Sequence, residues 1–217
     1  MGPRAHRLHE LVSFLPSEEA SPERVIEWGL PRVAGRLVEI SASGSSASLT
    51  AVFGLVIDAQ QRGEPTAWIT LLESTFFPPD VVAGSVDLDR LPVVRTKEPL
   101  TAGRAALHLL RSGGFGLVVI DFGIRPRESR IHRIPTPLQT KLVGLAQKHD
   151  TAVVVLTEKT RETPSLGSLI SLRAEARRVD ARHQTMSYEV QLHILKDKRL
   201  GPGNIFREVC YGPDGLC

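Results

Sequence analysis

The sequence contains little of what marks a metal centre, a secreted protein or a membrane protein. Its two cysteines, Cys210 and Cys217, lie near the C-terminus and outside any CxxC or histidine-rich spacing of the kind that zinc sites show. No run of about 18 apolar residues, the length that spans a bilayer, occurs. The N-terminal stretch MGPRAHRLHELVSF has no long apolar core either. We therefore expect a reduced, cytoplasmic protein without a metal and without membrane contact.

Charge of one sign is also scarce, because 27 lysine and arginine residues face 24 aspartate and glutamate residues. The net charge of +3 does not by itself indicate a nucleic-acid partner, so the distribution of the cations has to decide that question. Hydrophobic residues make up 41% of the 217 residues. That is enough to form the core of a single domain.

What the sequence does contain is an alternation of apolar strands and amphipathic helices. Strand patterns occupy residues 36–40, 66–72, 93–94, 117–121 and 152–156, and helix patterns occupy 47–61, 78–84, 99–112 and 136–149. This order predicts an α/β fold with a mainly parallel sheet covered by helices on both faces. The three segments after residue 170 are predicted antiparallel strands at one edge, and they read SLRAEARRVDARH, MSYEVQLHILKDK and NIFREVCYG.

Helical periodicity also predicts the core-facing side chains and the division of the chain. The expected inward residues are Leu49, Val52, Phe53 and Val56 in helix 47–61, and Leu138, Leu142 and Leu145 in helix 136–149. Residues 1–30 form a predicted lead-in of two short helices, and residues 31–217 form the core domain. The first lead-in helix carries an apolar face made of Leu8, Leu11, Val12 and Leu15.

The turn after strand 36–40 lies where a P-loop NTPase has its phosphate-binding loop, between a strand and a helix. In such loops glycines let the backbone wrap the phosphates, a lysine neutralises their charge, and a serine or threonine hydroxyl holds magnesium. Aligned with G-x-x-x-x-G-K-[ST], this chain has Ala42, Ala47, Ser48 and Leu49 at the four specified positions, with Gly44 inside the turn. We expect the turn not to bind ATP, and a turn that never was a phosphate loop fits the same residues.

Longer stretches carry a resemblance to RecA. The run GLPRVAGRLVEISASGSSASLT, residues 29–50, resembles the entry into the RecA core, where a GRIVEI-type strand leads into the nucleotide loop. VIDAQQRGEPTAWI resembles the next helix and strand, GGFGLVVIDF resembles the Walker B strand, and HILKDKRLGPG and YGPDGL resemble the last strands. The similarity covers residues 29–216 in the same order. It implies a RecA-like core with a degenerate phosphate loop.

The resemblance implies roles for individual residues. Asp121 falls where RecA has a magnesium-associated acid, and Glu73 falls near its catalytic glutamate if a one-residue shift is allowed. Glu158 stands near a nucleotide-sensing glutamine, and Lys196 and Lys198 match paired lysines that RecA presents to a neighbour's nucleotide. Each position also fits a structural role, since strand-end acids orient loops and strand lysines are commonly exposed.

Cations gather in two segments, about 122–135 and 158–168, that match the DNA-binding loops of RecA. The candidates for weak contact with single-stranded DNA are Arg125, Arg127, Arg130, His132, Arg133, Lys159 and Arg161. Arg173, Arg177, Arg178 and Arg182 add positive charge further along the chain. Aromatic residues make up 5% of the chain, so base stacking has little support and a solvated charge cluster is the alternative. Both segments are short for RecA, so an ATP-driven recombination filament is not expected.

A RecA-like core without a working phosphate loop is similar to two bacterial families, ImuA and SulA. The length and the helical lead-in favour ImuA, the accessory protein of a damage-inducible mutagenesis cassette. That resemblance implies a non-catalytic adaptor in SOS mutagenesis by error-prone translesion synthesis. It would need no cofactor and would bind RecA, an ImuB-type polymerase-like protein and a DnaE-type polymerase.

The candidate partner-binding residues are Leu8, Leu11, Val12, Leu15, Lys196 and Lys198. The lead-in helix fits packing on its own domain equally well. Two other functions stay open, a SulA-like inhibitor of cell division and a divergent ATPase that uses Lys196 or Lys198 as a substitute phosphate ligand.

Overall fold

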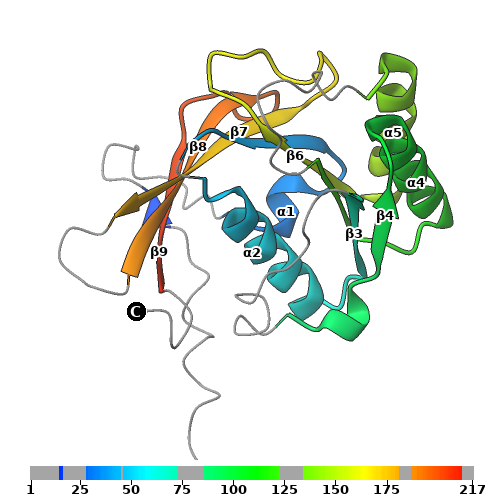
Figure 1. Ribbon diagram of the computed structural model, residues 1–217, viewed down its shortest axis with the longest axis horizontal. Helices are drawn as coiled ribbons and strands as arrows, with labels where there is room; N and C mark the ends of the chain where they lie inside the picture. Colours follow the sequence, from blue (N-terminus) through cyan, green and yellow to red (C-terminus); the bar gives the residue numbers. More distant parts are fainter. Residues whose placement is uncertain are drawn as a thin grey trace, which may run out of the picture.

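The computed structural model of the chain describes residues 15–16, 28–44, 46–72, 86–122, 134–180 and 187–211. The described residues form a nine-stranded sheet with the order β1-β9-β8-β7-β2-β6-β5-β3-β4 (Figure 1). The strands are β1 (Leu15–Pro16), β2 (Leu37–Ala42), β3 (Thr66–Leu71), β4 (Val93–Thr96), β5 (Leu117–Asp121), β6 (Ala152–Glu158), β7 (Leu172–Asp180), β8 (Ser187–Asp197) and β9 (Ile205–Tyr211). The helices are α1 (Leu30–Val33), α2 (Ser48–Gln61), the 3-10 helix η2 (Leu88–Arg90), α4 (Pro99–Ser112) and α5 (Thr136–His149).

Strands β7, β2, β6, β5, β3 and β4 run parallel to one another, and β8, β9 and β1 continue the sheet in antiparallel fashion. This confirms the predicted mainly parallel sheet with antiparallel strands at the C-terminal edge. One strand differs from expectation, because β7 is antiparallel to β8 but parallel to β2. A parallel neighbour requires a long crossover, and residues 159–171 supply it by passing from β6 over β2.

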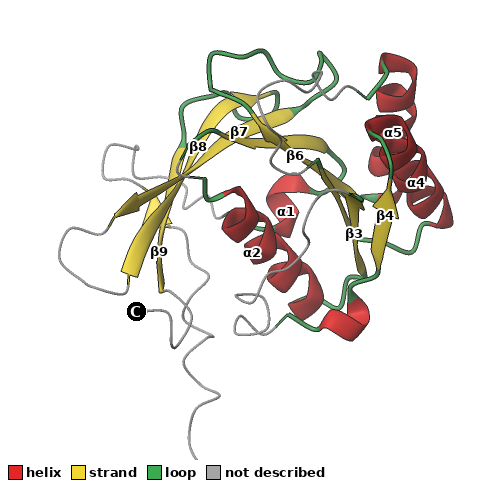
Figure 2. Cartoon of the chain, viewed as in Figure 1, coloured by secondary structure: helices red, strands yellow, loops and turns green. Residues whose placement is uncertain are grey.

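The sheet has two differently covered faces, as Figure 2 shows. Helix α2 covers one face, where Val38 and Ile40 of β2 join a cluster with Leu117 and Val119 of β5. Helices α4 and α5 cover the other face. Val118 and Ile120, which alternate with Leu117 and Val119 along β5, point toward these helices. Alternation along a strand sends neighbouring side chains to opposite faces. The central strands are therefore buried on both faces, because their side chains pack against helices on each side of the sheet.

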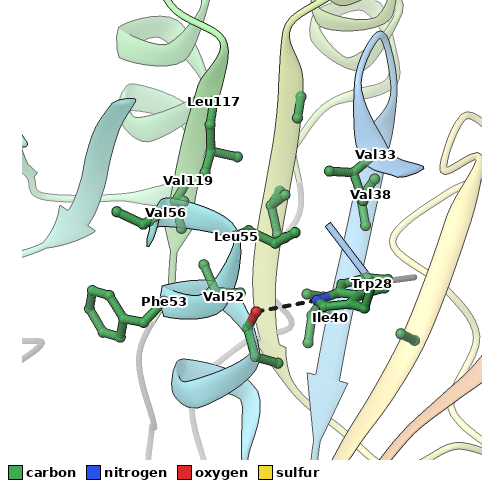
Figure 3. Close-up of a cluster of buried hydrophobic side chains, with 14 of the residues drawn as sticks. Trp28, Val33, Val38, Ile40, Val52, Phe53, Leu55, Val56, Leu117 and Val119 are labelled. Carbon is green, nitrogen blue, oxygen red and sulfur yellow. Dashed lines mark hydrogen bonds between the residues drawn. The ribbon is translucent and has the colours of Figure 1, made fainter. Parts of the chain in front are cut away.

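Aromatic residues fix α2 against the sheet. The Phe53 ring of α2 stacks on Trp68 of β3, with ring centroids 4.9 Å apart and planes within 7°. At the other side of the helix, Trp28 Nε1 donates a hydrogen bond of 3.3 Å to the carbonyl of Ala51 (Figure 3). These contacts hold the start of α2, and therefore the turn that precedes it, in one position.

Three predicted positions differ from the structure, two in the core-facing helices and one in the lead-in helix. Leu49 is 48% exposed, and Leu55 is the fully buried leucine of α2 instead. Leu49 lies in the first turn of α2, on the side of the helix that faces solvent. Leu145 of α5 is only half-buried, because it borders the gap between α4 and α5. Leu15, predicted to end a helix, lies in β1, where it pairs with Arg207 of β9.

The predicted helix at 78–84 and the predicted lead-in helices before residue 28 lie outside the described residues, apart from β1. No helix within the described ranges is long and apolar enough to cross a membrane.

Candidate functional site

The turn between β2 and α2 is closed onto β7. Gly44 has φ +74°, a left-handed conformation that glycine adopts without strain. Ser46 forms an isolated antiparallel bridge with Arg177 of β7, and Ala47 precedes the first helical residue, Ser48. The turn therefore extends the sheet edge for one residue before α2 begins.

Two of the backbone donors that a phosphate loop would offer to its ligand are used inside the protein here. The amide of Ala47 donates a long hydrogen bond of 3.4 Å to the carbonyl of Ala176 in β7. The amide of Ser48 donates to Ser46 Oγ at 3.3 Å, and the two serine hydroxyls lie 2.9 Å apart. Ala47 is 2% exposed and Ser48 is 9% exposed. Because anion binding at a helix N-terminus depends on free amides, this turn presents a poor cradle for phosphate.

The side chains of the turn do not fit a triphosphate or its magnesium ion. Ser48 stands at the position of the phosphate-binding lysine and offers no positive charge. Leu49 stands at the position of the magnesium hydroxyl, and its side chain has no oxygen to bind a hard cation. No group of three or more histidine, cysteine, aspartate or glutamate residues suited to a metal ion occurs in the part of the chain that the structure describes.

The acids named from the sequence lie at the carboxyl edge of the sheet. Asp121 ends β5, is 8% exposed, and pairs in register with Leu156 of β6 and Thr70 of β3. Glu158 ends β6 beside Ala42 and is exposed. The pattern of an apolar run ending in an acid therefore located this edge correctly. Glu73 lies outside the described residues.

A buried ion pair that the sequence reasoning missed sits next to the turn. Glu39, in the middle of β2, is fully buried, and its Oε1 lies 2.5 Å from Lys159 Nζ. The same carboxylate accepts hydrogen bonds of 3.0 Å from Thr157 Oγ1 and from the amide of Leu166. Burial lowers the pKa of Lys159, and the hydrogen bond and charge of Glu39 oppose that shift. An acid inside the apolar run LVEISA was the available signal, because a buried charge needs a partner.

Arg173 joins Glu39 in holding the crossover from β6 to β7. Its guanidinium donates to the carbonyls of Thr160 and Thr163, and its Nε lies 4.0 Å from Glu39 Oε2. Arg173 is 4% exposed. It therefore adds no surface charge, contrary to its predicted place among exposed cations. The segment 158–168, which the sequence resemblance predicts to correspond to a DNA-binding loop of RecA, is anchored to the sheet by these contacts.

The remaining candidate cations are scattered. Arg161 is exposed on the crossover, and Lys196 pairs in register with Arg173. Lys198 is exposed, and its Nζ donates a hydrogen bond of 2.7 Å to the carbonyl of Ser168. Burial, followed by the charge of Lys198, lowers the pKa of Lys196. The other predicted DNA contacts and the first lead-in residues lie outside the described residues, namely Arg125, Arg127, Arg130, His132, Arg133, Leu8, Leu11 and Val12.

Comparison with known proteins agrees with this architecture. No protein-family model matches the chain. RecA from Borrelia hermsii strain HS1 / DAH is 25% identical in an alignment of 219 positions, which covers 87% of this chain and 61% of that protein. RecA proteins from Paramagnetospirillum magneticum and Rhodospirillum rubrum are also 25% identical, each in an alignment of 214 positions that covers 85% of this chain. The alignments cover 59% and 58% of those proteins, respectively. The chain thus spans about three fifths of the length of the RecA proteins it matches. It has a RecA-like α/β core and is distantly similar to RecA over most of its own length.

Proposed function

We propose that this chain is a RecA-like adaptor that works without binding or hydrolysing a nucleotide. The observation that carries the proposal is the closed turn between β2 and α2. There the amide of Ala47 is bonded to Ala176, and Ser48 and Leu49 replace the lysine and the magnesium hydroxyl. A lost charge-assisted contact to phosphate is worth about 1.5 to 3 kcal/mol. The turn is thus suited to holding α2 on the sheet rather than to phosphoryl transfer.

The finer part of the proposal is a role in DNA-damage-induced, error-prone translesion synthesis, as in the ImuA family. The chain would bind RecA, an ImuB-type polymerase-like protein and a DnaE-type polymerase as part of SOS mutagenesis. Support comes from a RecA-like core that has lost the side chains for nucleotide chemistry while keeping its sheet. A core of this kind retains surfaces on which RecA-like proteins can assemble, but it has no cycle of hydrolysis to drive them.

Direct contact with single-stranded DNA is a smaller part of the proposal. Of the two cations on segment 159–168, Lys159 is held by Glu39, and Arg161 is the exposed one. Nonspecific binding to a phosphate backbone scales with the number of cations that reach it. We therefore expect weak, strongly salt-dependent affinity for DNA from this segment.

Binding of purified partners to the immobilised full chain, in the absence of nucleotide, tests the adaptor role. The proposal expects saturable binding of RecA or of the ImuB-type protein from the same organism, unchanged by added ATP. If neither binds, the proposed role is wrong. Binding to the tubulin-like division protein in place of both would support the SulA-like alternative.

Charge reversal at the paired lysines refines that experiment. Lys196→Glu and Lys198→Glu together should weaken RecA binding by about tenfold if these side chains meet the partner. Arg62→Glu with Arg90→Glu is the matched control, because it changes the net charge equally at two exposed cations elsewhere, Arg62 at the C-cap of α2 and Arg90 on η2. Equal loss in both variants would assign the effect to net charge rather than to this surface.

A further inference from the structure

Helices α4 and α5 carry positive charge and no negative charge. Their segments, PLTAGRAALHLLRS and TPLQTKLVGLAQKH, contain no aspartate or glutamate. Four cations on these helices are exposed, and no ion pair joins any of them to a described residue; they are Arg104, Arg111, Lys141 and Lys148. Within the described part of the chain, whose full sequence has nearly balanced charges, the exposed sides of these two helices carry positive charge that no ion pair compensates.

The two helices lie side by side and run in the same direction (Figure 1). A Cβ added to Gly103 of α4 would come within 2.7 Å of Leu138 of α5. At the far end of the pair, a Cβ on Gly113 would come within 3.0 Å of His149. The helices are therefore in close contact near both ends.

Between these contacts lies a shallow groove, wide open to solvent, of about 360 Å³. It is lined by Leu107 and Arg111 of α4 and by Lys141, Gly144 and Leu145 of α5. The surface it offers is mostly apolar, with a cation on each helix at its border. A groove with an apolar floor and charged rims is the usual receptor for an amphipathic helix of opposite charge.

Gly144 keeps the groove open. It lies inside α5, where glycine is less favourable than alanine by about 1 kcal/mol. A Cβ built on Gly144 meets no atom within 4 Å. A larger side chain at this position would therefore project into the groove without displacing the core.

We propose that this groove, the α4–α5 groove, binds an acidic amphipathic helix of a partner protein. One or two bulky apolar side chains of that helix would fill the space above Gly144, and carboxylates would face Arg111 and Lys141. The chemistry favours a peptide over nucleic acid, because the floor is apolar and neither helix carries a phenylalanine, tyrosine or tryptophan on which a base would stack. The proposal does not depend on the empty turn, which adjoins α2 on the opposite face of the sheet.

A fluorescent peptide of about 16 residues, roughly four helical turns, with leucines at helical spacing and glutamates beside them, is a suitable probe. Anisotropy with the full chain should show saturable binding that weakens as salt is added. A peptide with the same leucines and lysine in place of glutamate should not bind. Absence of saturable binding by the acidic peptide would overturn the proposal.

Three variants locate the site. Arg111→Glu with Lys141→Glu should reduce affinity by at least about tenfold, and Gly144→Leu should do the same by filling the groove. Arg90→Glu, an exposed cation on η2, should leave affinity within about twofold. Thermal melts establish that each variant is folded, and Gly144→Leu is expected to melt no lower than the parent. Unchanged binding by Gly144→Leu, or tighter and competing binding of a thymidine oligonucleotide, would contradict a peptide groove.

Discussion

The ammonium group of Lys159 lies 2.5 Å from Glu39 Oε1, where it compensates a carboxylate that is fully buried in the middle of β2. Glu39 also accepts from the amide of Leu166. One side chain thus binds the first residue of the crossover that follows β6 and a residue in its interior. Because the crossover passes over β2, the ion pair fixes the segment that the sequence resemblance predicts to correspond to a DNA-binding loop of RecA.

Removal of this buried pair should be far more destabilising than removal of an exposed one. Lys159→Ala leaves Glu39 charged and buried, which typically costs about 3 to 5 kcal/mol. Arg62→Ala breaks an exposed pair with Asp58 and should cost less than about 1 kcal/mol. Urea denaturation followed by circular dichroism measures both. Similar midpoints for the two variants would mean that Glu39 finds another partner.

Glu208 of β9 should make stability fall as pH rises from about 4.5 to about 7. Burial raises the pKa of this carboxyl from 4.5 to about 7. The folded protein therefore holds the proton more tightly than the unfolded chain does. This stabilising contribution is complete below pH 4.5 and is lost as pH rises through about 7. Glu208→Gln should raise the melting temperature relative to the parent at pH 8 and leave it nearly unchanged at pH 4; a constant difference would contradict the assigned burial.

Cys210 should react slowly with thiol reagents. Burial, followed by the charge of Glu208, raises its pKa to about 12, so the thiolate is scarce at neutral pH. Alkylation with iodoacetamide, read by mass spectrometry of the Cys210 peptide, should be slow in the folded protein and fast in urea. Rapid labelling of the native protein at pH 7 would show that the thiol is more accessible than the structure indicates.

Two glycines with equally open surroundings should respond oppositely to alanine. A Cβ on Gly144 or on Gly44 meets no atom within 4 Å. Gly144 lies inside a helix, so Gly144→Ala should stabilise the protein by about 1 kcal/mol. Gly44 has φ +74°, so Gly44→Ala should destabilise it by about 1 to 2 kcal/mol. Denaturation midpoints check both, and a stabilising Gly44→Ala would mean that the β2–α2 turn adopts another backbone conformation.

The sheet was predictable where local pattern and burial agree. Residues 117–121 and 152–156 were assigned as strands because a buried parallel strand is a continuous apolar run. The direction of β7 was not predictable in this way, because its parallel partner β2 lies far away along the chain and only its antiparallel partner β8 is close in sequence. The exposure of Leu49 was not predictable either, because helical spacing alone does not reveal which residues of the first turn of α2 face solvent.

The side chains of the turn can be compared with a phosphate-loop pattern from the sequence, but the contacts around it cannot be predicted in this way. Comparing four positions of the turn with a phosphate-loop pattern was enough to identify Ser48 and Leu49 as unsuitable. The partner of Lys159 was not evident, because Glu39 lies 120 positions earlier in the sequence. Residues read as free cations, such as Lys159 and Arg173, proved to be held by buried charge and by backbone carbonyls.

The most direct test of the account is calorimetric titration of the full chain with ATP and magnesium, beside a variant that restores the phosphate-loop side chains, Ala47→Gly with Ser48→Lys and Leu49→Thr. We expect no measurable binding of ATP to the parent up to about 1 mM nucleotide. Any binding free energy would then be weaker than roughly 4 kcal/mol in magnitude. Micromolar binding by the parent would contradict this expectation and would identify the protein as a divergent nucleotide-binding member of the RecA-like group.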